Sequence, residues 1–155
     1  MIYLFDWGNT LMVDFPHAQG KMCDWEHVEA VPQARETLAI LSQNHPIYIA
    51  TSASDSNMEE VQRAFVRVDL DQYLNGYFCF ANLGIAKNQP EFYLAIAKQL
   101  GVNVSGITMV GDLPHKDIYP AMKAGVNTIW FNPTGADAPA EAIPNQIRCL
   151  SELIP

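Results

Sequence analysis

Polar side chains that could do chemistry follow directly after short apolar runs in this sequence. Asp6 follows "IYLF", Thr51 and Ser52 follow "IYIA", and Asp112 follows "ITMVG", while Lys87 stands in the polar stretch "AKNQP". Two carboxylates can hold a hard divalent cation through oxygen ligands. Hydroxyl and ammonium groups can neutralise the oxygens of a bound phosphate. These residue types predict a site for a phosphoryl group and a cation, provided that the fold brings them together.

The side chains converge if the apolar runs are neighbouring strands of one sheet. Runs of strand length alternate with segments of helical periodicity. Strands are predicted at 2–5, 47–50, 77–81, 107–110 and 128–131, and helices at 31–44, 56–68, 90–101 and 116–125. Continuous apolar strands that alternate with helices are typical of a parallel sheet with right-handed crossovers. We therefore predict a three-layer α/β domain with a mainly parallel, five-stranded sheet. Ligands of such sheets bind at the carboxyl ends of the strands.

Several helix ends are marked by particular residues. Pro32 and Pro90 stand at predicted helix starts. Gly101 is placed to end the helix that Pro90 begins. Ser56 and Glu59 have the spacing of a capping box and predict the start of the helix at 56–68.

The length of 155 residues is that of one domain, so we predict a single domain over 1–155 with no separate cap domain. The sizeable irregular segment is 12–30, "MVDFPHAQGKMCDWEHVEA". It is too short for a second domain but long enough to form a flap over a site. The segment 147–153 is predicted as a closing element.

Composition and charge narrow the classes of partner. The chain is 49% hydrophobic and carries 17 acidic against 9 basic residues, for a net charge of −8. This balance argues against nucleic acid or an anionic membrane as a main partner, since binding either relies on clustered Lys and Arg. The cysteines are far apart and show no metal-ligand spacing, and no apolar stretch has membrane-spanning length. Without a signal peptide, the chain is predicted to be cytoplasmic, with reduced thiols at Cys23, Cys79 and Cys149.

Four segments, "FDWGNTL", "IYIATS", "AKNQPEF" and "VGDLPHKD", resemble in the same order the four signature segments of the haloacid dehalogenase-like (HAD) hydrolase superfamily. The match extends from near the start of the chain to about Gly125. It is closest in kind to phosphatase-type members with no cap or a minimal cap. The resemblance implies a Rossmann-like core in which the strands at 2–5 and 107–110 are adjacent, so that Asp6 and Asp112 meet.

The resemblance also implies a mechanism of covalent phosphoryl transfer on a phosphorylated substrate. Asp6 would attack phosphorus and form an aspartyl-phosphate that water then hydrolyses. Mg²⁺ would be held by the carboxylates of Asp6 and Asp112 and by the backbone carbonyl of Gly8.

Three further positions match residues that bind the phosphoryl group in this superfamily. Thr51, with Ser52 beside it, would bind phosphate oxygens, and Lys87 would stabilise charge on the phosphoryl group. Asp117 would orient Lys87 or a metal-bound water.

Gly8 departs from the pattern of the phosphatase branch, which usually has a second aspartate there as general acid. Glycine keeps the carbonyl but has no side chain to move a proton, and the amide of Asn9 does not titrate usefully. General acid–base catalysis contributes about 10²–10⁴-fold, so its loss predicts slow turnover or a restriction to good leaving groups. Candidates for a replacement are Asp14, His17 and His115, with Asp24, Glu26 and His27 also in the irregular segment.

Two hypotheses from different classes follow. The first is a Mg²⁺-dependent phosphatase of reduced activity. The second is a catalytically impaired domain that binds a phosphorylated ligand or a protein. A dehalogenase or phosphonatase activity is less favoured. Superfamily members with these activities carry a substantial inserted cap domain, whereas the irregular segment of this chain is short. An open site suits a large substrate or closure by another subunit, so an oligomer stays among the expectations.

Overall fold

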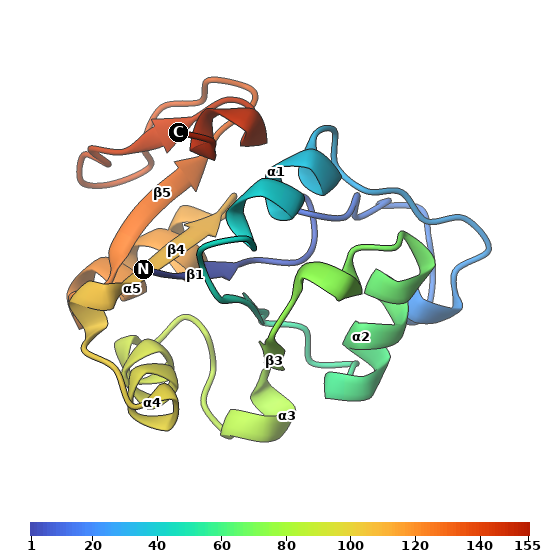
Figure 1. The fold of residues 1–155 in the computed structure, drawn as a ribbon, viewed down its shortest axis with the longest axis horizontal. Helices are drawn as coiled ribbons and strands as arrows, with labels where there is room; N and C mark the ends of the chain where they lie inside the picture. Colours follow the sequence, from blue (N-terminus) through green and yellow to red (C-terminus); the bar gives the residue numbers. More distant parts are fainter.

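A parallel sheet runs through the middle of the protein, as Figure 1 shows for the computed structural model, which describes residues 1–155. Its strand order is β3-β2-β1-β4-β5-β6, and every neighbouring pair is parallel. The strands are β1 (Ile2–Phe5), β2 (Ile47–Ala50), β3 (Gly76–Phe78), β4 (Ile107–Gly111), β5 (Asn127–Phe131) and β6 (Gln146–Ile147). The predicted parallel α/β sheet is confirmed, as is the adjacency of β1 and β4, in which Phe5 lies opposite Val110.

The prediction of five strands is wrong by one. β6 has only two residues, and Ile147 pairs with Phe131 at the edge of the sheet. Two residues are too few to show the alternating pattern of a strand, so the sequence predicted only a closing element at 147–153. The same region ends in the 3₁₀ turn η5 (Leu150–Leu153).

The helices alternate with the strands along the chain. The α-helices are α1 (Ala34–Leu41), α2 (Met58–Arg67), α3 (Phe80–Leu83), α4 (Pro90–Leu100) and α5 (Tyr119–Ala124). Shorter turns are η1 (Met22–Asp24), η2 (Asp71–Tyr73), η3 (Val104–Gly106) and the π-helical turn η4 (Pro114–Ile118). None of these helices is long and apolar enough to cross a membrane.

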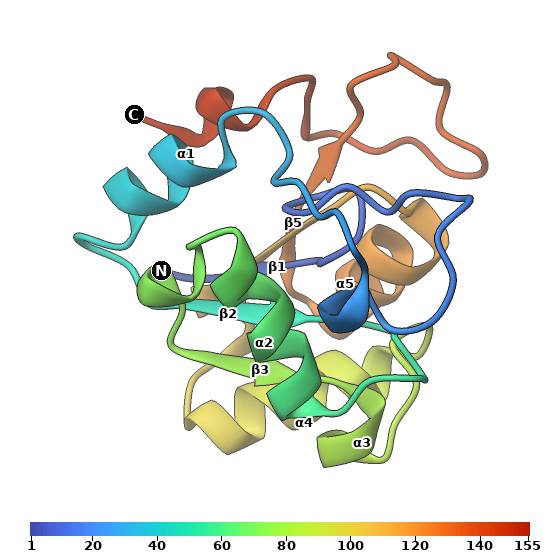
Figure 2. The ribbon, with the colours of Figure 1, turned by 90° about the vertical axis from the view of Figure 1, so that its right-hand side faces the viewer.

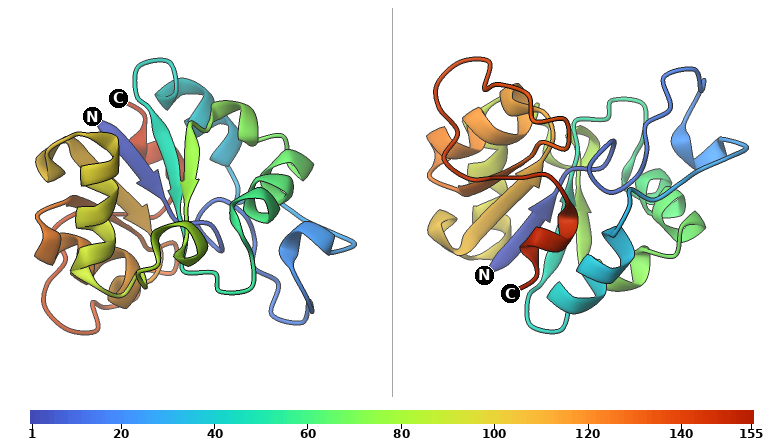
Figure 3. Two further views of the ribbon diagram at one scale, coloured as in Figure 1. Left: turned by 90° about the horizontal axis from the view of Figure 1, so that it is seen from below. Right: turned by 90° about the horizontal axis from the view of Figure 1, so that it is seen from above.

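The two faces of the sheet are covered by different helices, which gives the three layers. Leu38 of α1 and Phe65 of α2 are fully buried in one apolar cluster with Phe5. Phe92 of α4 and Ala121 of α5 are buried in a second cluster on the other face. In the left view of Figure 3 the cyan and green helices lie on one side of the strands and the yellow and orange helices on the other.

Helix ends agree with the sequence in one case and differ in another. Pro90 begins α4, and Gly101 ends it in the left-handed conformation. The capping box of α2 is shifted by one residue from the prediction: the Asn57 side chain accepts from the Glu60 N–H, and Glu60 accepts from the Asn57 N–H. Ser56, the predicted cap, instead donates its hydroxyl to a neighbouring carboxylate.

The irregular segment 12–30, here called the flap, follows the carboxyl end of β1 and ends shortly before α1 begins. Its base is closed by an antiparallel bridge between Met12 and Ala30. Its far part lies against α2, where Arg63 pairs with Asp24 at 3.1 Å, and Lys21 pairs with Glu60. Figures 1 and 2 show the blue flap beside the green helix α2.

Candidate active site

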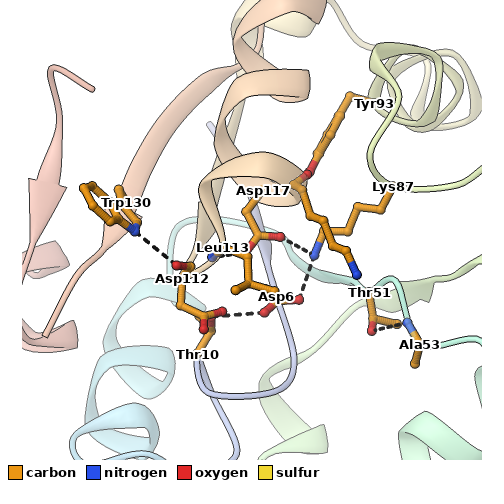
Figure 4. Close-up of polar contacts among 11 residues, drawn as sticks. Asp6, Thr10, Thr51, Ala53, Lys87, Tyr93, Asp112, Leu113, Asp117 and Trp130 are labelled. Atoms are coloured by element: carbon orange, nitrogen blue, oxygen red, sulfur yellow. Dashed lines mark hydrogen bonds and ion pairs between the residues drawn. The ribbon is translucent and has the colours of Figure 1, made fainter. Parts of the chain in front are cut away.

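The predicted polar residues meet at the carboxyl ends of the central strands (Figure 4). Asp6 follows β1, Asp112 follows β4 and Thr51 follows β2. Chain order reverses at β1, which has β2 on one side and β4 on the other. Such a switch point leaves a crevice at the sheet edge, the usual place for a ligand in an open α/β sheet.

Lys87 lies fully buried between two carboxylates. Its Nζ is 2.7 Å from Asp6 Oδ1 and 2.6 Å from Asp117 Oδ1. Burial alone would lower the pKa of Lys87, but the charges of Asp117 and Asp6 outweigh it, and the net pKa lies above the usual value. The ammonium group therefore stays charged and links the loop before α4 to the ends of β1 and η4.

The carboxylate of Asp117, a residue of η4, is held by two partners. Besides its ion pair with Lys87, its Oδ2 accepts the Leu113 N–H at 2.9 Å. Burial and the charge of Asp6 raise the pKa of Asp117 to about 6, partly offset by Lys87. Its carboxylate is thus placed to orient Lys87.

Asp112 faces Asp6 through a shared hydroxyl group. The Thr10 Oγ1 atom lies 3.3 Å from Asp6 Oδ2 and 3.2 Å from Asp112 Oδ1. One hydroxyl proton can serve only one of these carboxylates at a time. Burial, followed by the charge of Asp6, raises the pKa of Asp112 to about 8. Negative charge at this point is therefore only partly compensated by the protein.

The donor set fits a hard divalent cation. One carboxylate oxygen from each of Asp6, Asp112 and Asp117 can be chosen so that all lie within 4.8 Å of one another. Three carboxylates stand against one ammonium group. Lys87 pairs with one oxygen of Asp6 and one of Asp117, and the other Asp117 oxygen accepts the Leu113 N–H, which leaves Asp6 Oδ2 and the Asp112 carboxylate. Asp6 and Asp112 are the pair that remains for a cation, and oxygen ligands of this kind suit Mg²⁺.

A cavity of about 410 Å³ lies beside Asp6, the member of this cluster that lines it. Its inner wall includes Asp6, Thr51 and Ser52, and the flap contributes Met22 and Trp25. The Thr51 hydroxyl oxygen accepts the Ala53 N–H at 3.1 Å, which leaves the hydroxyl proton free to be donated into the cavity. Of the predicted phosphate-binding residues, Thr51 and Ser52 therefore border the same space as Asp6, whereas Lys87 lies buried behind it.

Of the residues considered as a replacement for the missing general acid, one lies in the cavity with Asp6 and the others lie elsewhere. Of the titratable residues in the flap, only Asp14 lines the cavity that contains Asp6. His115 packs against the Tyr119 ring and lines another depression. A further depression, away from Asp6, is lined by His17, Asp24, Glu26 and His27.

Two site residues were missed from the sequence. Thr10 bridges the carboxylates of Asp6 and Asp112, and its position four residues after Asp6 in the same turn was the available signal. Lys116, inside "VGDLPHKD", lines the cavity and places a cation at its wall. No spacing rule separates such a lysine from an ordinary surface charge.

Gly111→Ala should destabilise the protein, because the structure has no space for the methyl group of an alanine at position 111. A Cβ atom at Gly111 would lie 2.3 Å from Asp117 Oδ2, and Asp117 cannot retreat without leaving Lys87. We expect a loss of about 1–3 kcal/mol in the free energy of unfolding, measured by urea denaturation. Gly106→Ala is the matched control, since a Cβ there meets nothing within 4 Å. Equal losses in the two variants would contradict the close packing of Asp117 on Gly111.

Asp112→Asn should stabilise the metal-free protein at alkaline pH. The pKa of Asp112 rises from 3.8 to about 8 on folding, so the ionised carboxylate opposes folding. The resulting loss of stability begins above about pH 4 and is complete above about pH 8. In EDTA we expect the variant to unfold at least about 2–4 °C above wild type at pH 8.5, equivalent to about 1 kcal/mol. The difference should shrink at pH 5.

Thermal unfolding of exposed Asp137→Asn gives the control for this measurement, and it should show no such pH-dependent gain. An Asp112→Asn variant that is less stable than wild type at pH 8.5 would show that charge repulsion at Asp112 is not a significant cost.

Comparison with known proteins is consistent with this site. A family model described as haloacid dehalogenase-like hydrolase matches residues 3–125. The chain is 29% identical over 105 residues to a glyceraldehyde 3-phosphate phosphatase of Pyrococcus furiosus, and 32% identical over 136 residues to (S)-2-haloacid dehalogenase 4A of Burkholderia cepacia. These matches cover 68% and 86% of this chain, but only 43% and 58% of the two relatives.

Solved structures show the same core. An uncharacterized protein from Listeria monocytogenes serotype 4b matches with a TM-score of 0.82 and 20% identity, over 98% of this chain and 94% of that one. A 2-haloacid dehalogenase from Pseudomonas syringae matches with a TM-score of 0.70 and 30% identity, over 82% of this chain and 52% of that one. Since the family model spans all four signature segments, the chain belongs to the haloacid dehalogenase-like hydrolase family.

Proposed function

We propose that this protein is a Mg²⁺-dependent phosphatase that works through an aspartyl-phosphate on Asp6. The observation that carries the proposal is the environment of Asp6 at the cavity wall. Lys87 binds one of its carboxylate oxygens at 2.7 Å, and the other lies beside Thr10, which also contacts Asp112. Asp6 is thereby oriented towards a space that Thr51 also borders.

The cation would be held by the carboxylates of Asp6 and Asp112 and by the carbonyl of Gly8. When bound, Mg²⁺ screens the repulsion between an anionic nucleophile and an anionic substrate and helps to orient the phosphate. Thr51 and Ser52 would donate hydrogen bonds to the phosphate oxygens, as their position along the cavity allows.

In the reaction, a carboxylate oxygen of Asp6 attacks phosphorus as the bond to the leaving group breaks. Lys87 stabilises the charge on the transferred phosphoryl group, and Asp117 keeps the ammonium group in position. Water then attacks phosphorus, which releases phosphate and restores the Asp6 carboxylate.

Gly8 limits this proposal, because it offers no carboxyl group of its own to protonate the leaving group. Unless another side chain supplies that proton, we expect slow turnover, or a preference for leaving groups that depart without a proton, such as aryl or acyl phosphates. The expectations of a cytoplasmic protein, and of a phosphorylated ligand in place of nucleic acid or a membrane, stay part of the proposal. The net charge of −8 supports the second of these expectations.

The names of the relatives point to two reactions, phosphate ester hydrolysis and dehalogenation. Charge favours the first. A haloacid would add a further carboxylate to a cluster of three carboxylates that has one buried cation, Lys87. A phosphate bound together with a divalent cation makes better use of a cluster that has an excess of negative charge.

The alternative is a catalytically impaired domain that binds a phosphorylated ligand or a protein. The side chain missing at Gly8 favours it. In this case Asp6 and Asp112 would hold a cation and a phosphate without turnover.

Hydrolysis of p-nitrophenyl phosphate separates the two functions. We expect Mg²⁺-dependent turnover by wild type that EDTA stops, and no measurable turnover by Asp6→Asn, which lacks the nucleophile. Exposed Asp137→Asn is the control and should match wild type. Undiminished activity of Asp6→Asn would show that the covalent mechanism is wrong. If wild type is inactive but is stabilised by Mg²⁺ with beryllofluoride, and Asp6→Asn is not, the binding domain is favoured.

A further inference from the structure

The place beside the nucleophile where Gly8 lacks a side chain is filled by another residue. A Cβ atom at Gly8 would lie 3.3 Å from the Cβ atom of Asp14 and 3.5 Å from its Oδ2 atom. The flap therefore brings a carboxyl group to the space into which a side chain at position 8 would extend. A larger residue at Gly8 would compete with Asp14 for this space.

The backbone around Asp14 is held against the loop that carries Asp6. The Asn9 side-chain oxygen accepts the Asp14 N–H at 2.9 Å, and the Asn9 N–H donates to the Met12 carbonyl at 2.6 Å. On the other side, the Val13 N–H donates to the Glu29 carbonyl at 2.9 Å, which joins the two ends of the flap. Asn9 has the left-handed φ of 60° that this tight return requires.

The carboxyl group of Asp14 is also free to act. It lines the same cavity as Asp6 and Thr51, and it takes part in none of the ion pairs of the protein. Asp24 of the flap is engaged by Arg63, in contrast, and lies outside this cavity. Asp14 thus combines a position beside Gly8 with a side chain exposed to the substrate space.

We propose that Asp14 is the general acid and base of this enzyme, supplied from the flap in place of a side chain at Gly8. The inference rests on the proposed phosphatase function. As Asp6 attacks phosphorus, the bond from phosphorus to the leaving oxygen breaks, and that oxygen takes its electron pair and the proton of Asp14. The Asp14 carboxylate then takes a proton from the water that attacks phosphorus. Phosphate leaves Asp6, and both carboxyl groups return to their starting states.

Asp14→Asn tests the role with two substrates that differ in their need for a proton. On an alkyl phosphate, glycerol 2-phosphate, we expect a loss of about 10²–10⁴-fold in kcat/KM, the usual contribution of a general acid. On p-nitrophenyl phosphate the first step needs little protonation, so nitrophenolate should appear as a burst of about one equivalent, followed by slow turnover. Glu26→Gln, a flap residue outside the cavity, should behave as wild type.

Exchange of the two residue types gives the sharper test. Asp14→Gly should lose activity as Asp14→Asn does, and adding Gly8→Asp should restore at least about tenfold, because the space beside position 8 is then vacant. Gly8→Asp in the wild-type background should not raise activity above wild type, since the new side chain would compete with Asp14 for that space. Thermal unfolding of every variant checks that each one folds.

The outcomes distinguish this inference from the proposed function. If Asp14→Asn retains wild-type activity on both substrates while Asp6→Asn is inactive, the phosphatase stands and the role of Asp14 is wrong. An equal loss in Asp55→Asn, which changes another carboxylate of the cavity, would also overturn it, because the effect would then belong to the charge of the cavity. Absence of turnover in wild type overturns both proposals.

Discussion

A single buried ammonium group holds this site together. Lys87 reaches Asp6 at 2.7 Å and Asp117 at 2.6 Å, and nothing else in the interior carries positive charge. Removing one partner of a buried ion pair costs about 3–5 kcal/mol, because the remaining charge is left without compensation. The geometry around the lysine is correspondingly tight: Asp117 packs on Gly111 where no side chain would fit, and η4 winds as a π-helical turn to present it. The position of Asp6 depends on this contact.

One lysine does not balance the negative charge of the three carboxylates in this cluster. Asp112 shares only the Thr10 hydroxyl with Asp6, and its raised pKa reflects burial beside another carboxylate. A protein that needed these groups only for stability would gain from replacing Asp112 with a neutral residue. The retained excess of carboxylate oxygens, of which those of Asp6 border a cavity, is better explained by a ligand that brings positive charge. The proposed cation and phosphate satisfy both the acidic cluster and the hydroxyl of Thr51.

Much of this arrangement could be predicted from the sequence, and the exceptions have physical causes. Asp6, Thr51 and Asp112 follow apolar runs, and parallel strands bring such positions to one edge whatever the details of the helices. The cap of α2 was displaced by one residue because Ser56 and Asn57 are both good caps with a glutamate three residues later. β6 and α3 are too short to show a period. The location of Asp14 depends on the return of an irregular flap, which follows no periodic pattern, so its carboxyl group was one candidate among several.

The strand order has a consequence for how the protein folds. β1 pairs with β4, from a distant part of the chain, and the acidic cluster draws its members from both of these strand ends and from η4. Contacts of such large sequence separation must pay the entropy of closing long loops before they gain stability, which slows folding. A chain emerging from the ribosome has Asp6 and Lys87 before Asp112 and Asp117 are made, so the centre of the sheet stays incomplete until β4 has emerged. The acidic cluster therefore becomes complete only when β4 and η4 join β1.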